Sequence, residues 1–396
     1  MATSTTTNTT TTQHNGASSS TSRSKTVTTL PPRPPYDAEL AVVRDTYPPF
    51  GPITNDFIVA LHSDPDGYGP LPTASGLIAG RPITHCEYEV ASLKPDDPPV
   101  TLSVFSPCTS TPTPDGSSSA GPLRRPCIYF MHGGAMIFLN RLFGLEQPLE
   151  WVMETGCVLV SVEYRLAPEN PQPAALHDCW AGLLWLHDTA AAARLGIDTD
   201  RIIVAGHSGG SCLAAGLALL ARDAALAAHP TPGLASSGSS VPSRTAPIRA
   251  QLLGCPMIDD RNDTASARQY HDGGEPWDGK SNAAAWAAVL GNRGDDYGPG
   301  VSEYFAPARA ASLAGLPEAW VDVGSADPFR DEAVTYASRL WEAGVQAELH
   351  VWPGGFHGFD VMAPDSVLGR RAKEAKLAWI KRIFAAQHDQ MNKSDV

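Results

Sequence analysis

The sequence has no uninterrupted run of about 18 apolar residues, which is the length that a membrane-spanning helix needs. It also has no cluster of basic residues, and Lys+Arg 29 against Asp+Glu 42 give a formal net charge of −13. Such a chain repels nucleic acid and acidic membrane surfaces. We therefore expect no membrane span and no nucleic-acid partner.

Motifs for a metal or a redox cofactor are absent as well. There is no H-E-x-x-H, no paired Cys/His cluster and no dinucleotide fingerprint, and the 7 cysteines form no C-x-x-C pair. A G-x-x-x-x-G-K-S match at 274–281 follows a polar segment instead of a strand, and it contains two acids and Pro276, which lacks an N–H donor. We expect no metal and no cofactor, and the cysteines are typical of a reducing compartment.

The first thirty residues have no acid and very few apolar side chains. They contain 12 Thr and 6 Ser, and the first acidic residue is Asp37. Such a segment cannot bury enough apolar surface to offset its ordering entropy, so residues 1–33 are predicted to be a disordered tail before a folded domain at 34–390. The tail lacks the apolar core of a secretory signal. We expect a cytoplasmic protein, with import into an organelle left open.

The rest of the chain carries a regular pattern of short apolar segments. Residues 83–90 and 100–104 alternate and predict an antiparallel pair. Further on, helical patterns at 175–195, 212–221 and 330–343 and from Asp365 lie between or after apolar runs. Strands that are apolar throughout and alternate with helices indicate an α/β fold whose parallel sheet is covered on both faces. The apolar runs are 127–131, 157–162, 202–205, 251–255, 319–323 and 348–352.

The sharpest motif is Gly206-His207-Ser208-Gly209-Gly210, the only G-x-S-x-G of the chain. It follows the run 202–205 and precedes the helical pattern at 212–221. A strand, a tight turn and a helix are the context in which such a serine projects as a nucleophile, and the helix N-terminus favours negative charge there. The alternative is a glycine-rich turn in which Ser208 only caps the helix.

A second glycine pair ends the run 127–131. In His132-Gly133-Gly134-Ala135, consecutive glycines let backbone N–H groups approach an oxyanion closely. We expect the N–H groups of Gly133, Gly134 and Gly209 to form the oxyanion hole. A plain turn before a loop is the alternative.

A nucleophilic serine needs a base, and the base needs a carboxylate. Asp327 and His357 each follow an apolar run near the C-terminus and are the predicted acid and base. Asp331 and Glu332 begin the next helix, where they favour its N-terminus. The remaining histidines of this region are predicted to be structural: His132, His207, whose side chain should diverge from Ser208, and His350.

Taken in order, these motifs resemble those of the hormone-sensitive-lipase-like esterases of the α/β-hydrolase superfamily. The resemblance extends over about 120–385. It implies an α/β-hydrolase fold with a mostly parallel eight-stranded sheet flanked by helices, and a cap from about 34–95 and 257–300. It implies the nucleophile Ser208, the acid Asp327 and the base His357. The matching segments are His132–Ala135, Tyr164–Glu169 (YRLAPE), Gly206–Gly210, Asp327–Glu332 (DPFRDE) and His357–Phe359 (HGF).

The nucleophile segment departs from the family pattern, which usually reads G-D-S-A-G-G. His207 stands in place of an acid, Gly209 in place of alanine and Ser211 in place of glycine. The backbone N–H of Gly209 is retained, so the departure does not exclude catalysis, although the more flexible Gly209 is expected to loosen the oxyanion hole. Arg165 and Glu169 of the YRLAPE segment are interpreted as a structural polar anchor.

These observations predict an enzyme: a serine hydrolase that cleaves small carboxylic esters of short to medium acyl chain through an acyl-enzyme. An acyltransferase, a thioesterase or an amidase with the same triad is the alternative, and a non-catalytic small-molecule receptor on this fold is less favoured. A homodimer is left open. The residues expected to line the substrate pocket are Met136, Trp277, Trp286 and Phe359.

Overall fold

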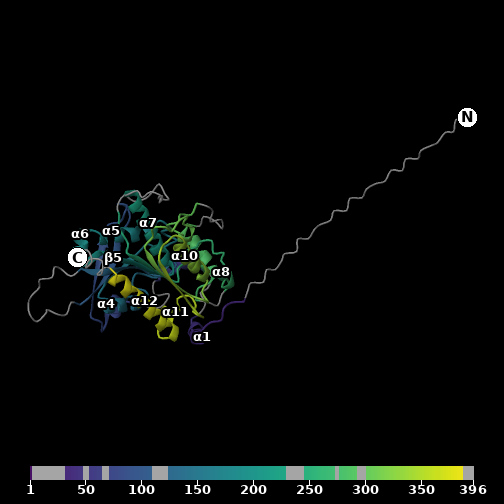
Figure 1. Ribbon diagram of the computed structural model, residues 1–396, viewed down its shortest axis with the longest axis horizontal. Helices are drawn as coiled ribbons and strands as arrows, with labels where there is room; N and C mark the ends of the chain where they lie inside the picture. Colours follow the sequence, from purple (N-terminus) through teal and green to yellow (C-terminus); the bar gives the residue numbers. More distant parts are fainter. Residues whose placement is uncertain are drawn as a thin grey trace, which may run out of the picture. The chain divides into compact units, whose positions relative to one another are not determined.

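In the computed structural model, an eight-stranded sheet runs through the unit that begins at Pro32 (Figure 1). The strand order is β1-β2-β4-β3-β5-β6-β7-β8. Strand β2 is antiparallel to β1 and β4, and the other neighbours are parallel. The predicted mostly parallel sheet is confirmed. The strands are β1 (Ile83–Val90), β2 (Val100–Pro107), β3 (Arg125–Met131), β4 (Val158–Glu163), β5 (Ile197–His207), β6 (Ala250–Gly254), β7 (Glu318–Gly324) and β8 (Ala347–Trp352).

The structure describes most of the chain after the predicted tail. Nearly all of the predicted tail at 1–33 lies outside the described residues, as do residues 109–123 and 229–244. The described residues are 1, 32–47, 53–64, 71–108, 124–228, 245–272, 276–291 and 300–386.

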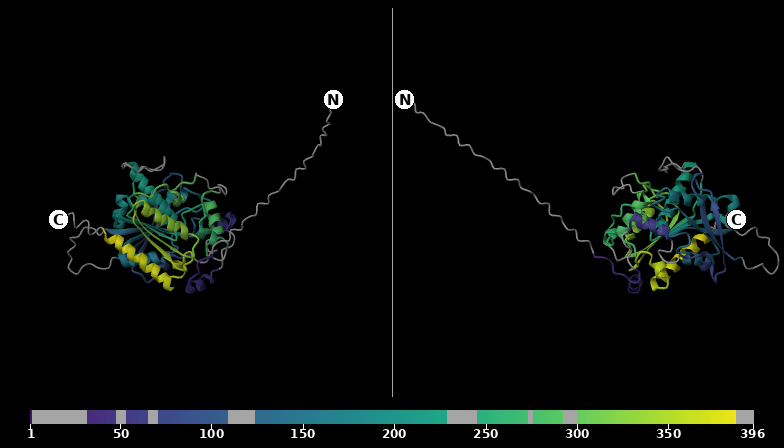
Figure 2. Two further views of the ribbon diagram at one scale, coloured as in Figure 1. Left: turned by 45° about the vertical axis from the view of Figure 1, so that its right-hand side comes forward. Right: turned by 180° about the vertical axis from the view of Figure 1, so that it is seen from behind.

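Helices cover both faces of the sheet (Figure 2). Helices α5, α7 and α10 pack on one face around a large apolar core, and α3, α4 and α12 pack on the other. Strand β3 is apolar throughout because both of its faces are covered: Tyr129 packs in the first core, and Ile128 and Phe130 pack in the second. The helices are α1 (Ala38–Arg44), α2 (Asn55–Ser63), α3 (Ala74–Ile78), α4 (Glu146–Thr155), α5 (Ala174–Leu186), α6 (Thr189–Leu195), α7 (Gly209–Ala228), α8 (Ala265–Gln269), α9 (Gly279–Val289), α10 (Arg330–Glu342), α11 (Phe359–Met362) and α12 (Val367–Ala385).

The helix predicted over 175–195 is wrong as a single element. Helix α5 ends at Leu186, and Asp188 begins α6 as its N-cap, where its side chain accepts hydrogen bonds from the N–H groups of Ala190 and Ala191. A short carboxylate side chain competes for backbone donors in this way and stops one helix while starting the next. The apolar pattern continues across the break because both helices pack on the same core.

Helix α7 is long and apolar enough to cross a membrane by length and composition alone, and it is the one such helix in the part of the chain that the structure describes. Of its most apolar window, 72% is buried inside the protein. The helix packs on β3, β5 and β6. Its apolar surface is therefore that of a central core helix.

Candidate active site

The nucleophile segment joins β5 to α7 by a single strained residue. Strand β5 ends at His207, α7 begins at Gly209, and Ser208 between them has φ +55°. A non-glycine residue with positive φ is uncommon and is held in place by its surroundings. Here the N–H of Ser208 donates to the carbonyl of Gly254 at 2.8 Å, and its own carbonyl accepts from the N–H of Ser211 at 3.0 Å. The strand–turn–helix context predicted for the serine is present.

Ser208, His357 and Asp327 form one continuous chain of hydrogen bonds. The Nε2 atom of His357 lies 3.0 Å from Oγ of Ser208, and its Nδ1 lies 2.9 Å from Oδ2 of Asp327. A carboxylate can only accept, so Nδ1 carries the proton and Nε2 is left as the acceptor that faces Ser208. The three residues come from the ends of β5, β7 and β8 and are brought together at one edge of the sheet.

Phe329 supports both partners of this chain. Its N–H donates to Oδ1 of the fully buried Asp327 at 2.8 Å, so each carboxylate oxygen has a partner. Its ring meets the imidazole of His357 edge-on, with centroids 4.9 Å apart and an interplanar angle of 89°. Phe329 was not among the predicted site residues, although its position two residues after the predicted acid was the available signal.

Two of the three glycines predicted for the oxyanion hole lie beside Ser208: Gly209 follows it in the chain, and a Cβ on Gly133 would lie 3.8 Å from its Cβ. Gly134 has φ +99°, and a Cβ there would lie 2.1 Å from the carbonyl oxygen of Phe138, so only glycine fits. A Cβ on Gly209 would lie 2.6 Å from Cα of Ala135, which shows how closely the two segments touch. Among the described residues, no acceptor takes the N–H of Gly133, Gly134 or Gly209. These donors are available to a ligand.

Two of the other histidines of this region are engaged elsewhere. His132 is fully buried and stacks on Tyr164, with centroids 4.1 Å apart and planes within 8°. Burial lowers the pKa of His132 to about 3, so its ring is neutral near pH 7. His350 stacks on Trp320 and Trp352 at 4.4 and 5.2 Å. Neither lies in the hydrogen-bond chain.

Segments of the predicted cap contact the loop that follows the glycine pair. On α2, His62 lies with Nε2 2.6 Å from the carbonyl oxygen of Ile137 and with Nδ1 2.9 Å from a carboxylate oxygen of Glu169. The ring of Trp277 meets that of Phe138 edge-on at 6.0 Å. The last part of the 34–95 range is not a cover, since 83–90 form strand β1 of the sheet. The contacts of α2 and Trp277 place these two segments next to the candidate site.

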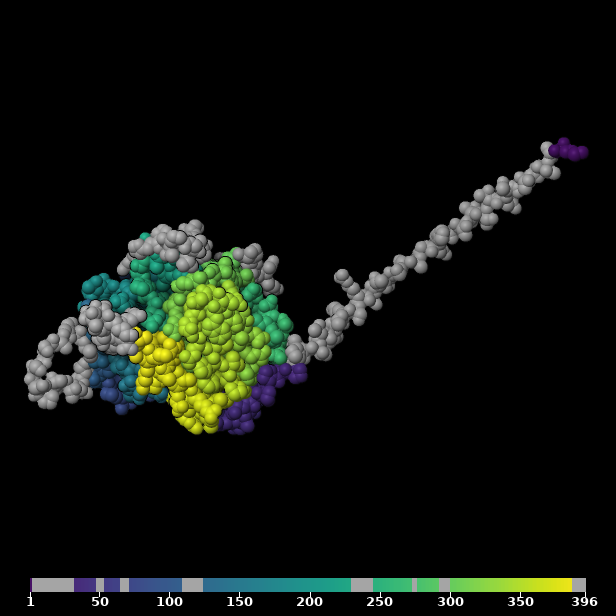
Figure 3. Space-filling view, in the orientation of Figure 1, coloured from purple at the N-terminus to yellow at the C-terminus, as the bar shows by residue number. Residues whose placement is uncertain are grey.

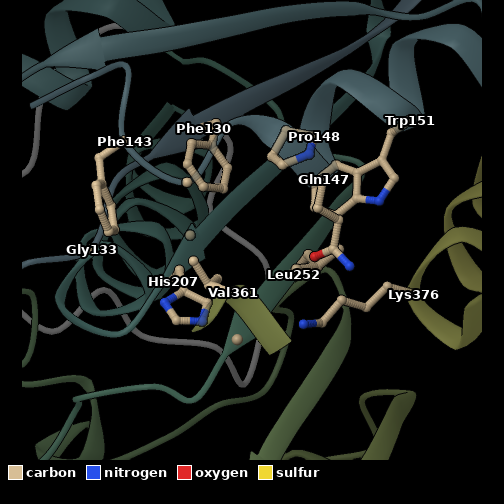
Figure 4. Close-up of a pocket in the computed structure, with 13 residues that line it drawn as sticks. Phe130, Gly133, Phe143, Gln147, Pro148, Trp151, His207, Leu252, Val361 and Lys376 are labelled. Atoms are coloured by element: carbon tan, nitrogen blue, oxygen red, sulfur yellow. The ribbon is translucent and has the colours of Figure 1, made fainter. Parts of the chain in front are cut away.

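The four predicted pocket residues are all buried. Met136, Trp277 and Trp286 belong to the large core, and Phe359 belongs to a smaller cluster with Leu40 and Phe356. A small hollow lies beside Gly133, and none of the four lines it (Figure 4). Their role toward a substrate stays a prediction. The hollow is lined in part by Phe130, Phe143, Pro148, Trp151, His207 and Lys376.

One group of side chains has the ligand types of a metal site. Atoms of Cys255, Asp327 and His357 lie within 4.8 Å of one another. Two of these residues already share the Asp327–His357 hydrogen bond, and burial raises the pKa of the Cys255 thiol well above its usual value. A metal needs the thiolate, which burial disfavours, so these residues fit the hydrogen-bond chain better than a metal centre.

A family model for the α/β-hydrolase fold matches residues 128–361, the stretch that contains all three members of the hydrogen-bond chain. The chain belongs to the α/β-hydrolase fold family. The resemblance to hormone-sensitive-lipase-like esterases is thereby confirmed. In this α/β hydrolase, Ser208, Asp327 and His357 follow the carboxyl ends of β5, β7 and β8.

Two esterases of Mycobacterium tuberculosis share about 30% sequence identity with this chain. Esterase LipI of Mycobacterium tuberculosis is 30% identical over 282 residues, which cover 70% of this α/β hydrolase and 77% of LipI. Carboxylesterase NlhH of the same species is 32% identical over 280 residues, covering 66% and 75%. Among solved structures, a bacterial heroin esterase has a TM-score of 0.69 at 31% identity and covers 88% of this chain and 98% of its own.

Proposed function

We propose that this α/β hydrolase is a serine hydrolase that cleaves small carboxylic esters through an acyl-enzyme. The observation that carries the proposal is the unbroken chain from Ser208 through His357 to Asp327, with steps of 3.0 and 2.9 Å. The names of LipI, NlhH and the heroin esterase support ester substrates.

Each side chain takes one part in the proposed reaction. His357 removes the proton of Ser208 through Nε2 while Oγ attacks the acyl carbonyl. The N–H groups of Gly133, Gly134 and Gly209 hold the oxyanion, and the N-terminus of α7 adds to their positive potential. His357 then protonates the departing alcohol, and Asp327 stabilises the imidazolium. Water repeats the sequence on the acyl-enzyme and releases the acid.

The cap segments limit which esters can enter. We propose that α2 and the segment with Trp277, which contact Ile137 and Phe138 next to the glycine pair, cover the acyl site. A cover so close to the loop that follows Gly133 and Gly134 suits short to medium acyl chains, with Met136, Trp277, Trp286 and Phe359 shaping the walls. A small molecule is the expected substrate.

The experiment that tests this proposal is a series of p-nitrophenyl esters from acetate to palmitate, run with the wild type and with Ser208→Ala. We expect a maximum of kcat/KM at short to medium chains and a loss of roughly 1,000-fold or more in Ser208→Ala. Unchanged hydrolysis by Ser208→Ala contradicts the proposal. Product analysis with added alcohols, amines and thioesters separates a hydrolase from an acyltransferase, an amidase or a thioesterase. Tight ligand binding without turnover would indicate the receptor alternative.

We also propose that two copies pair through the edge of the sheet at β8. Strand β8 has a hydrogen-bonded neighbour on one side, β7, and Val351 on it and Trp341 on α10 are exposed apolar side chains. The segments from β7 to α12 form much of the surface seen in Figure 3. An edge strand with apolar neighbours is a ready site for pairing. Light scattering measures the mass in solution. A value of twice the chain mass for the wild type and of one chain mass for Val351→Lys supports this dimer.

A cytoplasmic location is proposed as well. All seven cysteines are free, and five of them are buried. Burial raises the pKa of the Cys127, Cys179 and Cys212 thiols well above its usual value, so these thiols are protonated and inert. A reducing compartment suits this state. Imaging of full-length and 34–396 fluorescent fusions tests it, and an organelle signal that depends on 1–33 contradicts it.

A further inference from the structure

The residue that replaces the family's acid next to the nucleophile has a partner on the segment that carries the base. The Nε2 atom of His207 lies 3.4 Å from Oδ1 of Asp360. The same nitrogen lies 3.3 Å from Sγ of Cys255. Asp360 belongs to α11 and follows His357 by three residues. His207 therefore connects the turn of the nucleophile to the turn of the base.

Asp360 is also held from a second side. Its other carboxylate oxygen accepts a hydrogen bond from Nζ of Lys376 on α12. Lys376 in turn lies 3.2 Å from Oδ2 of Asp322 on β7, which also accepts from Nε1 of Trp352 at 3.0 Å. The side chains of Asp322, Asp360 and Lys376 are at most 5% exposed. We call His207, Asp322, Asp360 and Lys376 the buried charge network; two of its members, His207 and Lys376, line the hollow of Figure 4.

The charges of this network explain why the histidine is needed. Burial alone would raise the pKa of Asp360, but Lys376 and His207 outweigh burial and lower it. Burial alone would lower the pKa of Lys376, but Asp322 and Asp360 outweigh burial and raise it. Two carboxylates and one ammonium leave one negative charge in excess. The imidazole of His207 is the donor next to that charge, and an acid in its place would repel Asp360.

The segment with the base is also joined to the end of β7 by hydrogen bonds, and α11 adds an ionic contact through Asp360. The N–H of Ala326 donates to the carbonyl oxygen of Gly355 at 2.9 Å, and the N–H of Gly354 donates to Oγ of Ser325 at 2.8 Å. Helix α11 is four residues long, and Gly358 before it has φ +73°. Phe356 and Phe359 pack in a small apolar cluster with Leu40. Its ionic contacts run through Asp360 to His207 and Lys376. A shift of this segment would move Nε2 of His357 relative to Oγ of Ser208.

We propose that His207 and Asp360 are positioning residues for the proposed reaction: their contact, anchored by Lys376, holds the turn of His357 against the turn of Ser208. The inference rests on the proposed function. It assigns a role to the histidine that departs from the family pattern, and it identifies Asp360 as that histidine's counterpart. Neither residue touches the reacting atoms.

The decisive variant is His207→Asp, which restores the family's acid but places it against Asp360. We expect kcat to fall by roughly 10- to 100-fold with KM changed less than about twofold, because misplacing the base affects the chemical step more than substrate binding. Adding Asp360→Asn should recover at least about half of that loss on a logarithmic scale, since the repulsion is then removed. His207→Asn and Asp360→Asn alone should each lower kcat by roughly 3- to 30-fold.

An organophosphate titration of Ser208 separates positioning from folding. Rates are divided by the number of titrated serines, so a partly unfolded sample does not imitate a slower enzyme. Lys381→Met, which removes an exposed pair with Glu154, is the matched control and should leave kcat and KM unchanged. If His207→Asp does not fold, the two asparagine variants carry the test.

The outcomes are distinct. The inference is overturned if turnover per titrated serine stays at the wild-type value in all three variants, His207→Asp, His207→Asn and Asp360→Asn. The same holds if their melting temperatures fall while this turnover is unchanged. If kcat falls in His207→Asp and the added Asp360→Asn change does not raise it again, the proposed contact between His207 and Asp360 is overturned. If the organophosphate does not label Ser208 of the wild type, the proposed function fails instead.

Discussion

At the scale of single residues, the site depends on how few donors and acceptors each side chain offers. Asp327 uses one oxygen for the N–H of Phe329 and the other for His357. This leaves the imidazole one orientation and one tautomer, with Nε2 toward Ser208. The carboxylate therefore fixes geometry as much as it supplies charge.

This predicts the effect of Asp327→Asn. The amide can offer an N–H toward Nδ1, which favours the wrong tautomer, so kcat should fall by roughly 10,000-fold while the fold is retained. Steady-state kinetics with p-nitrophenyl butyrate and circular dichroism measure both. A variant with more than about a tenth of wild-type kcat contradicts the assignment of Asp327 as the acid.

At the scale of elements, Glu332 connects α10 to the loop after β6. Its Oε1 accepts from the N–H groups of Ile258 and Asp259 at 2.8 and 3.3 Å, and the neighbouring Asp331 accepts from the N–H of Ser266 at 2.7 Å. Both acids lie in the first turn of α10, as expected, and both also anchor the 257–266 segment. These contacts place the loop beside the end of β7, from which Asp327 projects.

Glu332→Gln should be tolerated, whereas Glu332→Ala should not. Burial raises the pKa of Glu332 well above its usual value, so the charged form is disfavoured and a neutral amide keeps the accepting oxygen. We expect Glu332→Gln to change the free energy of unfolding by less than about 1 kcal/mol, and Glu332→Ala to lower it by about 1–3 kcal/mol. Urea unfolding measures both. Equal losses in the two variants contradict the argument.

The elements themselves were largely predictable, for a physical reason. Central strands are covered on both faces, so β3 to β7 appear in the sequence as short apolar runs, and the edge strand β1 alternates over the predicted 83–90. The break between α5 and α6 was missed because the apolar pattern continues across it and only the capping side chain of Asp188 reveals it. The capping hydrogen bonds of Asp188 separate the two helices although the apolar periodicity continues across them.

The residues of the candidate site also fall into those that the sequence could predict and those that it could not. Ser208, Asp327 and His357 could be predicted because each follows a strand and sits in a local motif. Asp360, Lys376 and Cys255 carry no such motif. Asp360 and Cys255 meet His207, and Lys376 meets Asp360, only because α11, α12 and β6 are brought together by the whole sheet. Contacts between residues so far apart in the sequence follow from packing and cannot be inferred from local spacing.

At the scale of the whole molecule, a neutral histidine at its centre makes stability depend on pH. His132 is buried beside Gly133 and stacks on Tyr164, and burial lowers its pKa from 6.5 to about 3. Above pH 6.5 the ring is neutral in both the folded and the unfolded chain, so it adds no dependence there. Between pH 6.5 and about 3 the unfolded chain binds a proton that the folded chain does not, so stability is lost as the pH falls.

The slope from His132 alone approaches about 1.4 kcal/mol per pH unit once the unfolded ring is fully protonated. Urea unfolding of the wild type and of His132→Asn at pH 7.5, 6.5, 5.5 and 4.5 isolates this contribution, because other acidic groups titrate in both proteins. The variant should be less stable at pH 7.5, since it loses the stacking on Tyr164, and the gap should narrow steadily at lower pH. A constant gap over this range would show that the folded protein takes up the proton as readily as the unfolded chain, and that His132 is not the buried neutral group described above.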